Sequence, residues 1–366
     1  MTSRWRSRWS PAPCVQAPSS TPASGAWSTG PPIPRPAPYA PSTACSKTTG
    51  STTEPRSCPE SWKSPAPRCS QISSGTSAVP ELPEVESIRL ALLPTVAGRI
   101  VRRVDVRTRS VIAMPGDPPA GITRSRCRAP PARLQRRLLL QGCTIERIER
   151  RGKQLGIVST EGPALCVQLG MTGGLSLTDL PRPHEHIVWT LDDGSRLAFS
   201  DPRRFGLIGA HADVDDLMAV RWSTLGPDAL RLRAADLARA CDGSHRAIKA
   251  LLLDQRALAG VGNIYADESL FDSGVHPCTP AAILPPESIA RLALSIRRVL
   301  RAAVRSGGSS IRDFRSVHGH AGDYQMRHRV YARAGRPCPR CGTTLERIVV
   351  AQRGTVFCPT CQAAIG

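Results

Sequence analysis

Four cysteines near the C-terminus form two Cys-x-x-Cys pairs, Cys338 with Cys341 and Cys358 with Cys361. Zinc binds four thiolates at about 2.3 Å in a tetrahedron, and two such pairs can supply that geometry. The segment between the pairs, Thr343–Phe357, alternates apolar and polar residues, which predicts a β-hairpin. A unit this small buries little apolar surface, so a metal must supply much of its folding free energy. We therefore predict one structural zinc ion (Zn2+) here, with two disulfides as the alternative.

The other cysteines argue against the disulfide alternative. The chain has 13 cysteines, an odd number, and several of them lie singly along the chain. A secreted disulfide framework would show regular spacing, so a reducing compartment fits better. The chain also lacks the run of about 18 apolar residues that a membrane span requires, so we expect no membrane partner.

The net charge of +20 over 366 residues favours a polyanionic partner, most often nucleic acid. A merely soluble basic protein is the plainer alternative. Aromatic residues make up only 4%, which disfavours a protein that binds single strands by stacking bases on aromatic side chains. Together with the zinc module, the charge indicates a nucleic-acid enzyme or binding protein.

The chain changes character near residue 79. Residues 1–78 are rich in Pro, Ser, Thr and Arg, carry only Glu54 and Glu60 as acids, and show no apolar period. Such a segment cannot bury enough apolar surface to order itself, so three interpretations stay open: a disordered tail, an organelle transit peptide, or a stretch that is never translated.

From Pro80 onward the pattern predicts a folded α+β chain. A helix is expected to begin over 83–93, short strands with turn signals run to residue 210, and helical periods fill 215–305. Residues 115–131, rich in Pro and Arg, are expected to be an inserted loop, and 307–328 a loop rich in Gly, Ser and His. The expected strands are 100–106, 144–150, 156–159, 165–169, 186–191 and 196–199, and the expected helices 225–240, 247–253, 264–273 and 288–306.

The segment Pro80-Glu81-Leu82-Pro83-Glu84-Val85-Glu86 resembles the amino terminus of the formamidopyrimidine-DNA glycosylase family. In that family the initiator Met is removed, and the proline that follows attacks the sugar of a damaged nucleotide with its free amine. An α-amino group titrates near 8, so about a tenth of it is a neutral nucleophile at pH 7. The resemblance implies that Pro80 is the nucleophile, that Glu81 is the general acid and base, and that Glu84 assists.

The sequence departs from that family in one respect, because Pro80 follows Val79 and is internal. An internal proline nitrogen is an amide and cannot attack. Val79 stands where the family has Met, and a GUG codon reads as Val internally but as Met at initiation. We therefore expect translation to start at residue 79, with cleavage of a transit peptide after Val79 as the alternative.

Further motifs carry the resemblance in the same order along the chain. Arg150–Leu155 resembles a turn whose Lys153 contacts phosphate and donates a proton in β-elimination. Gln168–Gly173 and Asp201–Gly206 resemble the loops that fill the gap after a nucleotide is flipped out, which costs a few kcal/mol. The residues implied for that role are Met171, Arg203 and Phe205, with His184 and Arg204 as further DNA contacts.

Two more motifs lie in the second half. Ala259–Glu268 resembles the loop of a helix–two-turn–helix element, in which Asn263 binds the phosphate of the lesion strand and Lys249 helps. Gln352-Arg353-Gly354-Thr355 is expected at the hairpin tip of the zinc module, where Arg353 binds phosphates on both sides of the lesion. Taken alone, Met171 and Phe205 would more often be core residues, and a single Gly-rich loop is weak support.

The resemblance implies an α+β multidomain fold. We expect an extension over 1–79, an N-terminal antiparallel β-sandwich flanked by helices over 80–212, a helix–two-turn–helix domain over 213–328, and a C-terminal zinc-finger β-hairpin over 329–366.

The implied activity is that of a bifunctional DNA glycosylase and AP lyase in base excision repair. It would remove oxidised purines such as 8-oxoguanine and formamidopyrimidines from damaged double-stranded DNA, acting as a monomer in the bacterial cytoplasm with the nucleoid. Two alternatives stay open. One is an endonuclease VIII-like enzyme for oxidised pyrimidines; the other is a non-catalytic protein that binds damaged DNA if Pro80 stays internal.

Overall fold

The computed structural model describes residues 79–115, 117, 133–177, 179–309 and 322–364, together with the backbone of Arg56–Ser57. Everything below concerns the described residues of the unit that spans 53–366. The expected extension, most of the expected insertion at 115–131 and part of the expected loop at 307–328 lie outside the described residues.

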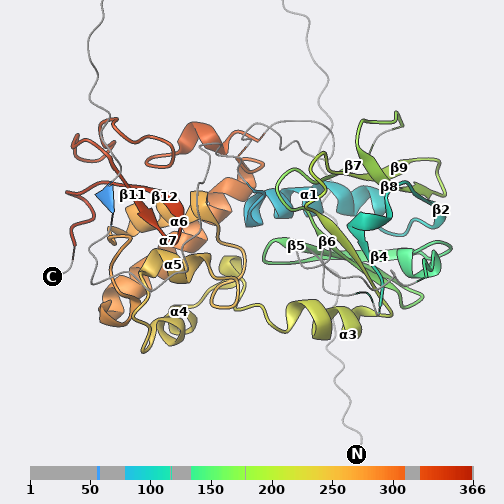
Figure 1. The fold of residues 1–366 in the computed structure, drawn as a ribbon, viewed down its shortest axis with the longest axis horizontal. Coiled ribbons are helices and arrows are strands. Elements are labelled where there is room, and N and C mark those ends of the chain that lie inside the picture. The colour runs from blue at the N-terminus through green and yellow to red at the C-terminus, as the bar shows by residue number, and fades with distance from the viewer. Residues whose placement is uncertain are drawn as a thin grey trace, which may run out of the picture. The chain divides into compact units, whose positions relative to one another are not determined.

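Two sheets face each other in the first part of the chain (Figure 1). The predicted strands are confirmed with small shifts at their ends, and β3, β7 and β10 are additions. The β-sandwich is antiparallel except at β3, which pairs parallel with β10 at Ile112 and Ile208. One sheet has the order β3 (Ile112–Ala113), β10 (Leu207–His211), β6 (Ala164–Gln168), β5 (Gln154–Ser159) and β4 (Ile145–Arg151); the other has β2 (Val101–Val106), β8 (Glu185–Leu191), β9 (Arg196–Ser200) and β7 (Gly174–Leu177).

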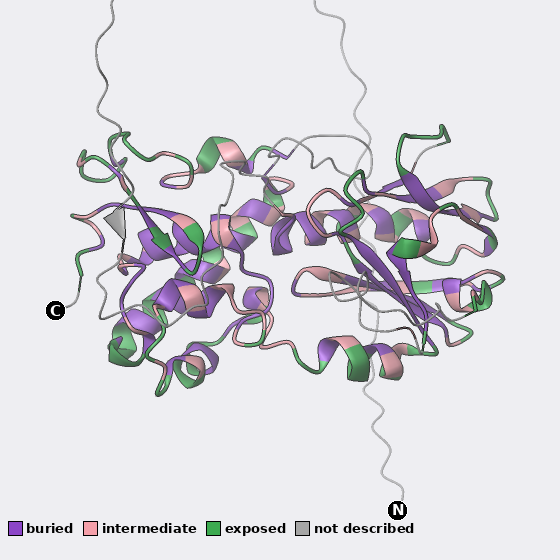
Figure 2. Ribbon diagram, viewed as in Figure 1, coloured by how far each residue is buried: buried purple, intermediate pink, exposed green. Residues whose placement is uncertain are grey.

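A shared apolar core holds the two sheets together. Ile157 of β5, Val167 of β6, Trp189 of β8 and Phe199 of β9 are all buried in it. Figure 2 shows the inner parts of these strands as buried. Because alternate residues of a strand point to opposite faces, the apolar alternation of the sequence is what directs these side chains inward.

Helix α1 (Leu82–Val96) belongs to two cores at once. Val85, Ile88 and Leu92 pack into the sandwich core, whereas Leu82 packs into the core of the helical region. The helix contacts β4 and β5 on one side and α7 on the other. Its first turn therefore lies at the junction of the two cores, which is where the acidic residues Glu81 and Glu84 are found.

The helical region begins with α3 (Val214–Leu217) and a π-helical turn (Met218–Trp222), and continues with α4 (Ala234–Cys241), α5 (Ile248–Leu253), α6 (Asn263–Ser273) and α7 (Pro286–Arg305). The last three agree with the predicted helices to within about two residues. The helix expected over 225–240 is wrong in its first half, where the chain forms only a short 3-10 turn (Ala229–Arg231). Pro227 lacks an N–H, and Asp228 instead accepts a hydrogen bond from the Leu230 N–H.

The C-terminal hairpin is confirmed. β11 (Glu346–Val350) pairs antiparallel with β12 (Arg353–Phe357), and the two-residue β1 (Arg56–Ser57) pairs parallel with β11. The tip consists of Ala351 and Gln352, both with positive φ as a type I′ turn requires, so Arg353 is the first residue of β12 rather than part of the tip. Within the described ranges, no helix combines the length and the hydropathy that a membrane span needs.

Candidate active site and metal centre

The carboxylate of Glu81 lies at the amino end of α6. Its oxygens accept hydrogen bonds from the backbone N–H groups of Gly262 at 2.8 Å and Ile264 at 3.0 Å. The first N–H groups of a helix have no partner within the helix and carry partial positive charge, so they favour a carboxylate there. A Cβ on Gly262 would lie 2.3 Å from the Glu81 carboxyl carbon, so only glycine leaves room for this contact.

Burial raises the pKa of Glu81 to about 7, with the charge of Glu84 adding to the rise and that of Lys153 opposing it. A carboxyl group with this pKa can give or take a proton at neutral pH. Pro80, directly before it, is buried, and the N–H of Leu82 donates to the carbonyl of Gly260 at 3.2 Å. The backbone directly after Glu81 is therefore held against the Gly-rich loop before α6.

The second carboxylate, Glu84, is equally buried and receives three donors. The Tyr265 hydroxyl donates to it at 2.6 Å, the Ser309 N–H at 2.7 Å, and the Glu81 N–H at 2.8 Å. Burial raises the pKa of Glu84, while the hydrogen bonds from Tyr265 and Ser309 act in the opposite direction. The pair of acids thus occupies one enclosed site in which each carboxylate is held by donors from the helical region.

Lys153 reaches the site from the turn between β4 and β5. The turn residue Gly152 has φ +56°, and a Cβ there would lie 3.0 Å from the Cβ of Ala259, so the turn lies close against the Gly-rich loop. The carboxylate of Asp228 accepts the Gly152 N–H at 3.0 Å and also binds Arg150. Burial lowers the pKa of Lys153, and the charges of Glu81 and Glu84 oppose that shift.

The zinc hairpin is tied to the same region by Lys249 and Asn263. The ammonium of Lys249 is fully buried and donates to Asp267 at 2.6 Å and to the Thr355 hydroxyl at 2.7 Å. The amide of Asn263 donates to the Gly354 carbonyl at 3.1 Å. Lys249 is therefore not at the surface, and contact with a phosphate would require it to leave Asp267.

Arg353 follows the hairpin tip and its side chain is exposed. Its charge lowers the pKa of both Lys153 and Lys249, after the larger effect of burial, so it is within electrostatic reach of both. The structure thus brings together Pro80, Glu81, Glu84, Lys153, Lys249, Asn263 and Arg353, which lie far apart in the sequence.

Met171, Arg203 and Phe205 form a second group on two neighbouring loops of the sandwich. The buried carboxylate of Asp201 accepts from the Arg203 N–H at 3.1 Å, the Gly206 N–H at 2.7 Å and the Thr172 hydroxyl. The Arg203 guanidinium lies 3.9 Å from the Met171 sulfur.

Phe205 is 61% exposed, which is unusual for such a large apolar side chain on a loop held by hydrogen bonds. His184 and Arg204 are also exposed, and both have positive φ. The His184 carbonyl accepts the Asp201 N–H at 3.1 Å. Its neighbour His186 points inward, with its ring nitrogens 2.9 Å from the Thr108 hydroxyl and 2.7 Å from the Asp201 carbonyl.

Three polar residues that hold the site had no role in the sequence-based prediction: Tyr265, Asp267 and Ser309. Tyr265 and Asp267 lie in the Ala259–Glu268 motif, yet nothing in the sequence separates them from ordinary helix residues. Their neighbour Glu268 is buried and accepts the N–H groups of Arg329, Val330 and Tyr331. Their roles come from contacts with other elements of the fold, so no local signal in the sequence could have found them.

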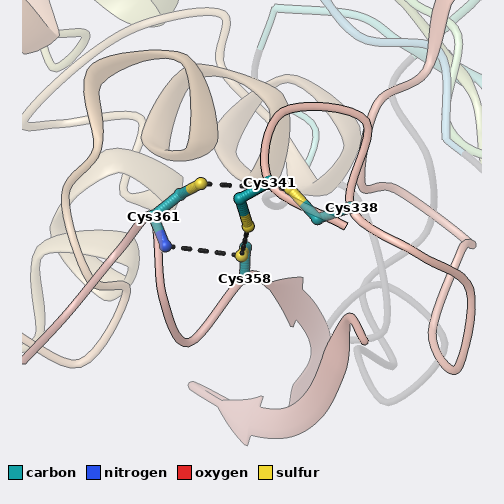
Figure 3. Close-up of side chains that lie close together, drawn as sticks. All are labelled: Cys338, Cys341, Cys358 and Cys361. Carbon is teal, nitrogen blue, oxygen red and sulfur yellow. Dashed lines mark hydrogen bonds between the residues drawn. The ribbon is translucent and has the colours of Figure 1, made fainter. Parts of the chain in front are cut away.

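The four cysteines of the C-terminal module fit a zinc ion (Figure 3). All four sulfur atoms lie within 4.8 Å of one another, with 4.0 Å between Cys338 and Cys361 and 3.4 Å between Cys341 and Cys358. Four thiolates at about 2.3 Å from zinc in a tetrahedron lie about 3.8 Å apart. Cys338 and Cys358 pack against Phe271 and Val330 in a small core. The predicted structural zinc site is confirmed.

Comparisons with known proteins agree with this arrangement. Sequence models match the formamidopyrimidine-DNA glycosylase N-terminal domain over residues 79–208, the H2TH domain of that enzyme over 225–315, and the zinc finger found in FPG and IleRS over 335–364. The formamidopyrimidine-DNA glycosylase of Thiobacillus denitrificans is 42% identical over 291 residues, which cover 78% of this chain and 100% of the relative. That of Thermus thermophilus is 42% identical over 293 residues, covering 78% and 98%.

Solved structures give the same result. The crystal structure of MutM (Fpg) from Thermus thermophilus has a TM-score of 0.65 at 40% identity, covering 78% of this chain and 100% of that one. A complex of Lactococcus lactis Fpg with DNA that contains an abasic site has a TM-score of 0.66 at 31% identity, with the same coverage.

The fold, the zinc module and the relatives define a DNA glycosylase of base excision repair. Within that class, the chain belongs to the formamidopyrimidine-DNA glycosylase family.

Proposed function

We propose that this enzyme removes oxidised purines, such as 8-oxoguanine and formamidopyrimidines, from double-stranded DNA and then cuts the strand as an AP lyase. The observation that carries the proposal is the position of Glu81. Its carboxyl group has a pKa of about 7 and is held by the amino end of α6, and the residue itself directly follows Pro80 in the chain. Solved relatives support DNA as the partner, since Lactococcus lactis Fpg is known in complexes with DNA containing Fapy-dG or an abasic site.

In this mechanism the neutral amine of Pro80 attacks the sugar C1′ of a flipped nucleotide, and Glu81 supplies the proton that opens the sugar ring. The base leaves with the electron pair of its bond to C1′ and takes up the proton that the Pro80 nitrogen loses, and the amine and sugar stay joined as a Schiff base. Lys153, whose pKa is lowered by burial, then assists β-elimination, and Arg353 binds the flanking phosphates for δ-elimination. The zinc ion, held by Cys338, Cys341, Cys358 and Cys361, supports the hairpin that carries Arg353.

Met171, Arg203 and Phe205 would fill the gap left by the flipped nucleotide. An exposed phenylalanine can wedge between stacked bases, and a guanidinium can donate to the unpaired partner base. His184 and Arg204 would contact the backbone nearby, and Asn263 the phosphate of the lesion strand. Lys249 would act from beneath the surface by holding Gly354 and Thr355 in place.

Pro80 can act only if its nitrogen is a free amine, so we propose Val79 as the translation start, with removal of the initiator Met. The family match begins at residue 79, and full-length relatives cover 78% of this chain. The test is the N-terminal sequence of the protein purified from its native host. A mature N-terminus at Pro80 supports the free amine, produced either by initiation at residue 79 or by cleavage after Val79, whereas an intact N-terminus at Met1 would refute both.

Borohydride trapping tests the chemistry. With protein that starts at Pro80 and duplex DNA containing 8-oxoguanine, reduction of the Schiff base should give a stable adduct, and protein with residues 1–79 attached should give none. The variant Glu81→Gln, which has nearly the same size, should lose at least a hundredfold in rate, as general acid–base groups typically contribute about 10²–10⁴. Absence of an adduct with an intact N-terminal proline would leave a DNA-binding protein as the better interpretation.

Oxidised pyrimidines are the second candidate substrate class, because one solved relative, Lactococcus lactis Fpg, is in complex with DNA containing an oxidised pyrimidine. Replacing 8-oxoguanine by thymine glycol in the same assay distinguishes the two. We further propose that the enzyme works as a monomer, since all the residues above come from one chain, and that it acts on nucleoid DNA in the bacterial cytoplasm, as its relatives are bacterial.

A further inference from the structure

A series of hydrogen bonds connects the side chains of Glu84 and His328 through two hydroxyl groups. The Tyr265 hydroxyl lies 2.6 Å from Glu84 and 3.2 Å from the Ser309 hydroxyl, which lies 3.0 Å from Nε2 of His328. Glu84, Tyr265 and Ser309 are buried, and His328 is partly exposed. A histidine from the segment that leads to the zinc module is thus connected to one of the two acids beside Pro80.

The number of protons fixes the direction of these hydrogen bonds. Each hydroxyl has one proton to donate, and an ionised carboxylate has none. Tyr265 gives its proton to Glu84, so it can only accept from Ser309. Ser309 has then used its own proton and can only accept from His328. All three bonds therefore point toward Glu84, and they require a hydrogen on Nε2 of His328.

The opposite tautomer would break the chain between Ser309 and Tyr265. If Nε2 carried no hydrogen, Ser309 would donate to His328, and the Tyr265 oxygen would lose its donor. A hydroxyl that accepts a hydrogen bond is a stronger donor, because hydrogen bonds in a chain polarise one another. The tautomer of His328 therefore changes the strength of the bond that Glu84 receives.

The surroundings hold the imidazole in place. Its ring meets the rings of Tyr324 and Tyr331 edge-on, with centroids 5.7 Å and 5.4 Å away. The N–H of Ser309 also donates to Glu84, so the backbone at Ser309 is fixed as well. Gly308, with φ +83°, has no room for a side chain, because a Cβ would lie 2.8 Å from a Glu84 oxygen.

We propose that His328 is a positioning residue for the reaction: its Nε2–H orients the Ser309 and Tyr265 hydroxyls so that Tyr265 donates to Glu84. The inference rests on the proposed function for its catalytic consequence. His328 is connected to Glu84 through the Ser309 and Tyr265 hydroxyls, so we assign it an indirect role. A purely structural role for the ring is the competing explanation, and two variants separate the two roles.

His328→Phe keeps an aromatic ring between Tyr324 and Tyr331 but has no donor, whereas His328→Gln keeps an N–H donor but has no ring. The assay uses the zinc-loaded enzyme with its natural N-terminus on duplex DNA containing 8-oxoguanine. We expect His328→Phe to lower kcat about tenfold with KM within about twofold of the parent, and His328→Gln to restore most of the rate. Parental kcat in His328→Phe would overturn the proposal. So would a kcat in His328→Gln that is as low as, or lower than, that of His328→Phe.

A double variant tests whether His328 acts through Ser309. Ser309→Ala should lower kcat by a similar factor, and adding His328→Phe to it should cause little further loss, because the chain is already broken. If the two losses multiply, the residues act independently and the proposed chain is wrong.

Nitrogen-15 NMR of labelled histidine gives a readout that does not depend on activity. Neutral His328 should be the Nε2–H tautomer in the full chain, and Ser309→Ala should weaken that preference. An Nδ1–H tautomer in the parent protein would refute the inference. An inactive parent with the expected tautomer would instead count against the proposed function alone.

Discussion

Burial raises the pKa of Glu81 from its ordinary value of 4.5 to about 7, which links the stability of the protein to pH. Between these two values the native state binds a proton that the unfolded state has released, so the contribution of Glu81 to stability falls as pH rises through this window. We expect the free energy of unfolding of wild type, relative to Glu81→Gln, to drop by about 3 kcal/mol between pH 4.5 and pH 8.

Urea unfolding of both proteins across this pH range measures the effect. Glu146→Gln, at an exposed position on β4, is the matched control and should follow wild type at every pH. A constant difference between wild type and Glu81→Gln would show that Glu81 keeps its ordinary pKa in the folded protein.

Adding one methyl group at Gly262 should displace the Glu81 carboxylate and slow the reaction. The Cβ in a Gly262→Ala variant would lie 2.3 Å from the Glu81 carboxyl carbon, so the carboxylate must move away from α6. Because small displacements of a reacting group can cost about a hundredfold in rate, we expect a loss of that order in kcat. Gly174→Ala, where a Cβ meets nothing within 4 Å, should keep full activity in the same single-turnover assay. Equal rates for the two variants would contradict the role given to the Glu81 contact.

The sequence was sufficient to predict the cysteine ligands from their spacing, and the resemblance of the Pro80–Glu86 segment singled out Glu81, because both are local patterns. It could not reveal Tyr265 or Ser309. Their importance comes from hydrogen bonds to Glu84, which precedes them by 181 and 225 positions. Contacts of this kind depend on the folded arrangement of α1 and α6, and no local pattern records them.

At the scale of secondary structure elements, the Lys249–Asp267 ion pair joins α5, α6 and β12. Both side chains are buried, and burial raises the pKa of Asp267 to about 6 while Lys249 acts to lower it. Removing one partner leaves an uncompensated buried charge, which typically costs about 3–5 kcal/mol. We expect that loss for Lys249→Met, with most of it recovered in the double variant Lys249→Met/Asp267→Leu.

The exposed pair of Arg246 and Asp254, at 2.9 Å, offers the comparison. Arg246→Ala should change the free energy of unfolding by less than about 1 kcal/mol, because solvent screens such pairs. Thermal or urea unfolding measures all three variants. A Lys249→Met variant as stable as Arg246→Ala would show that the buried pair does not hold the hairpin.

The helix expected over 225–240 shows why some elements cannot be predicted from periodicity. Leu230 and Leu237 are seven residues apart, as on one face of a helix, and Leu237 is buried in the helical core with Leu230 packed against it. Asp228, however, binds Arg150 and the Gly152 N–H of the β4–β5 turn, which holds residues 225–231 outside a helix. A tertiary ion pair therefore overrides the local preference, whereas α6 and α7 meet no such competitor and were predicted to within about two residues.

At the scale of the whole molecule, zinc removal should unfold the hairpin and leave the sandwich folded. The module has only a small core, which it shares with Phe271 of α6 through Val330 and Val356, so the metal supplies much of its folding free energy. We expect a chelator to abolish DNA binding and strand cleavage and to expose the amides of β11 and β12 to hydrogen exchange. The amides of β5 and β6 should stay protected.

Mass spectrometry of hydrogen exchange, with and without chelator, provides the measurement. Added zinc should restore both protection and activity, which controls for general damage. Equal loss of protection in the hairpin and in the sandwich would show that the metal holds the entire molecule together.

The position of α1 in two cores also has a consequence for synthesis on the ribosome. Chains emerge from the N-terminus first, at about 5–20 residues per second. The Gly262 and Ile264 amides that hold Glu81, and the Thr355 hydroxyl that binds Lys249, are therefore made long after Glu81 itself. A nascent or prematurely terminated chain carries the first acid without the later elements that bury it and thereby raise its pKa, so the reactive centre forms only when synthesis is almost complete.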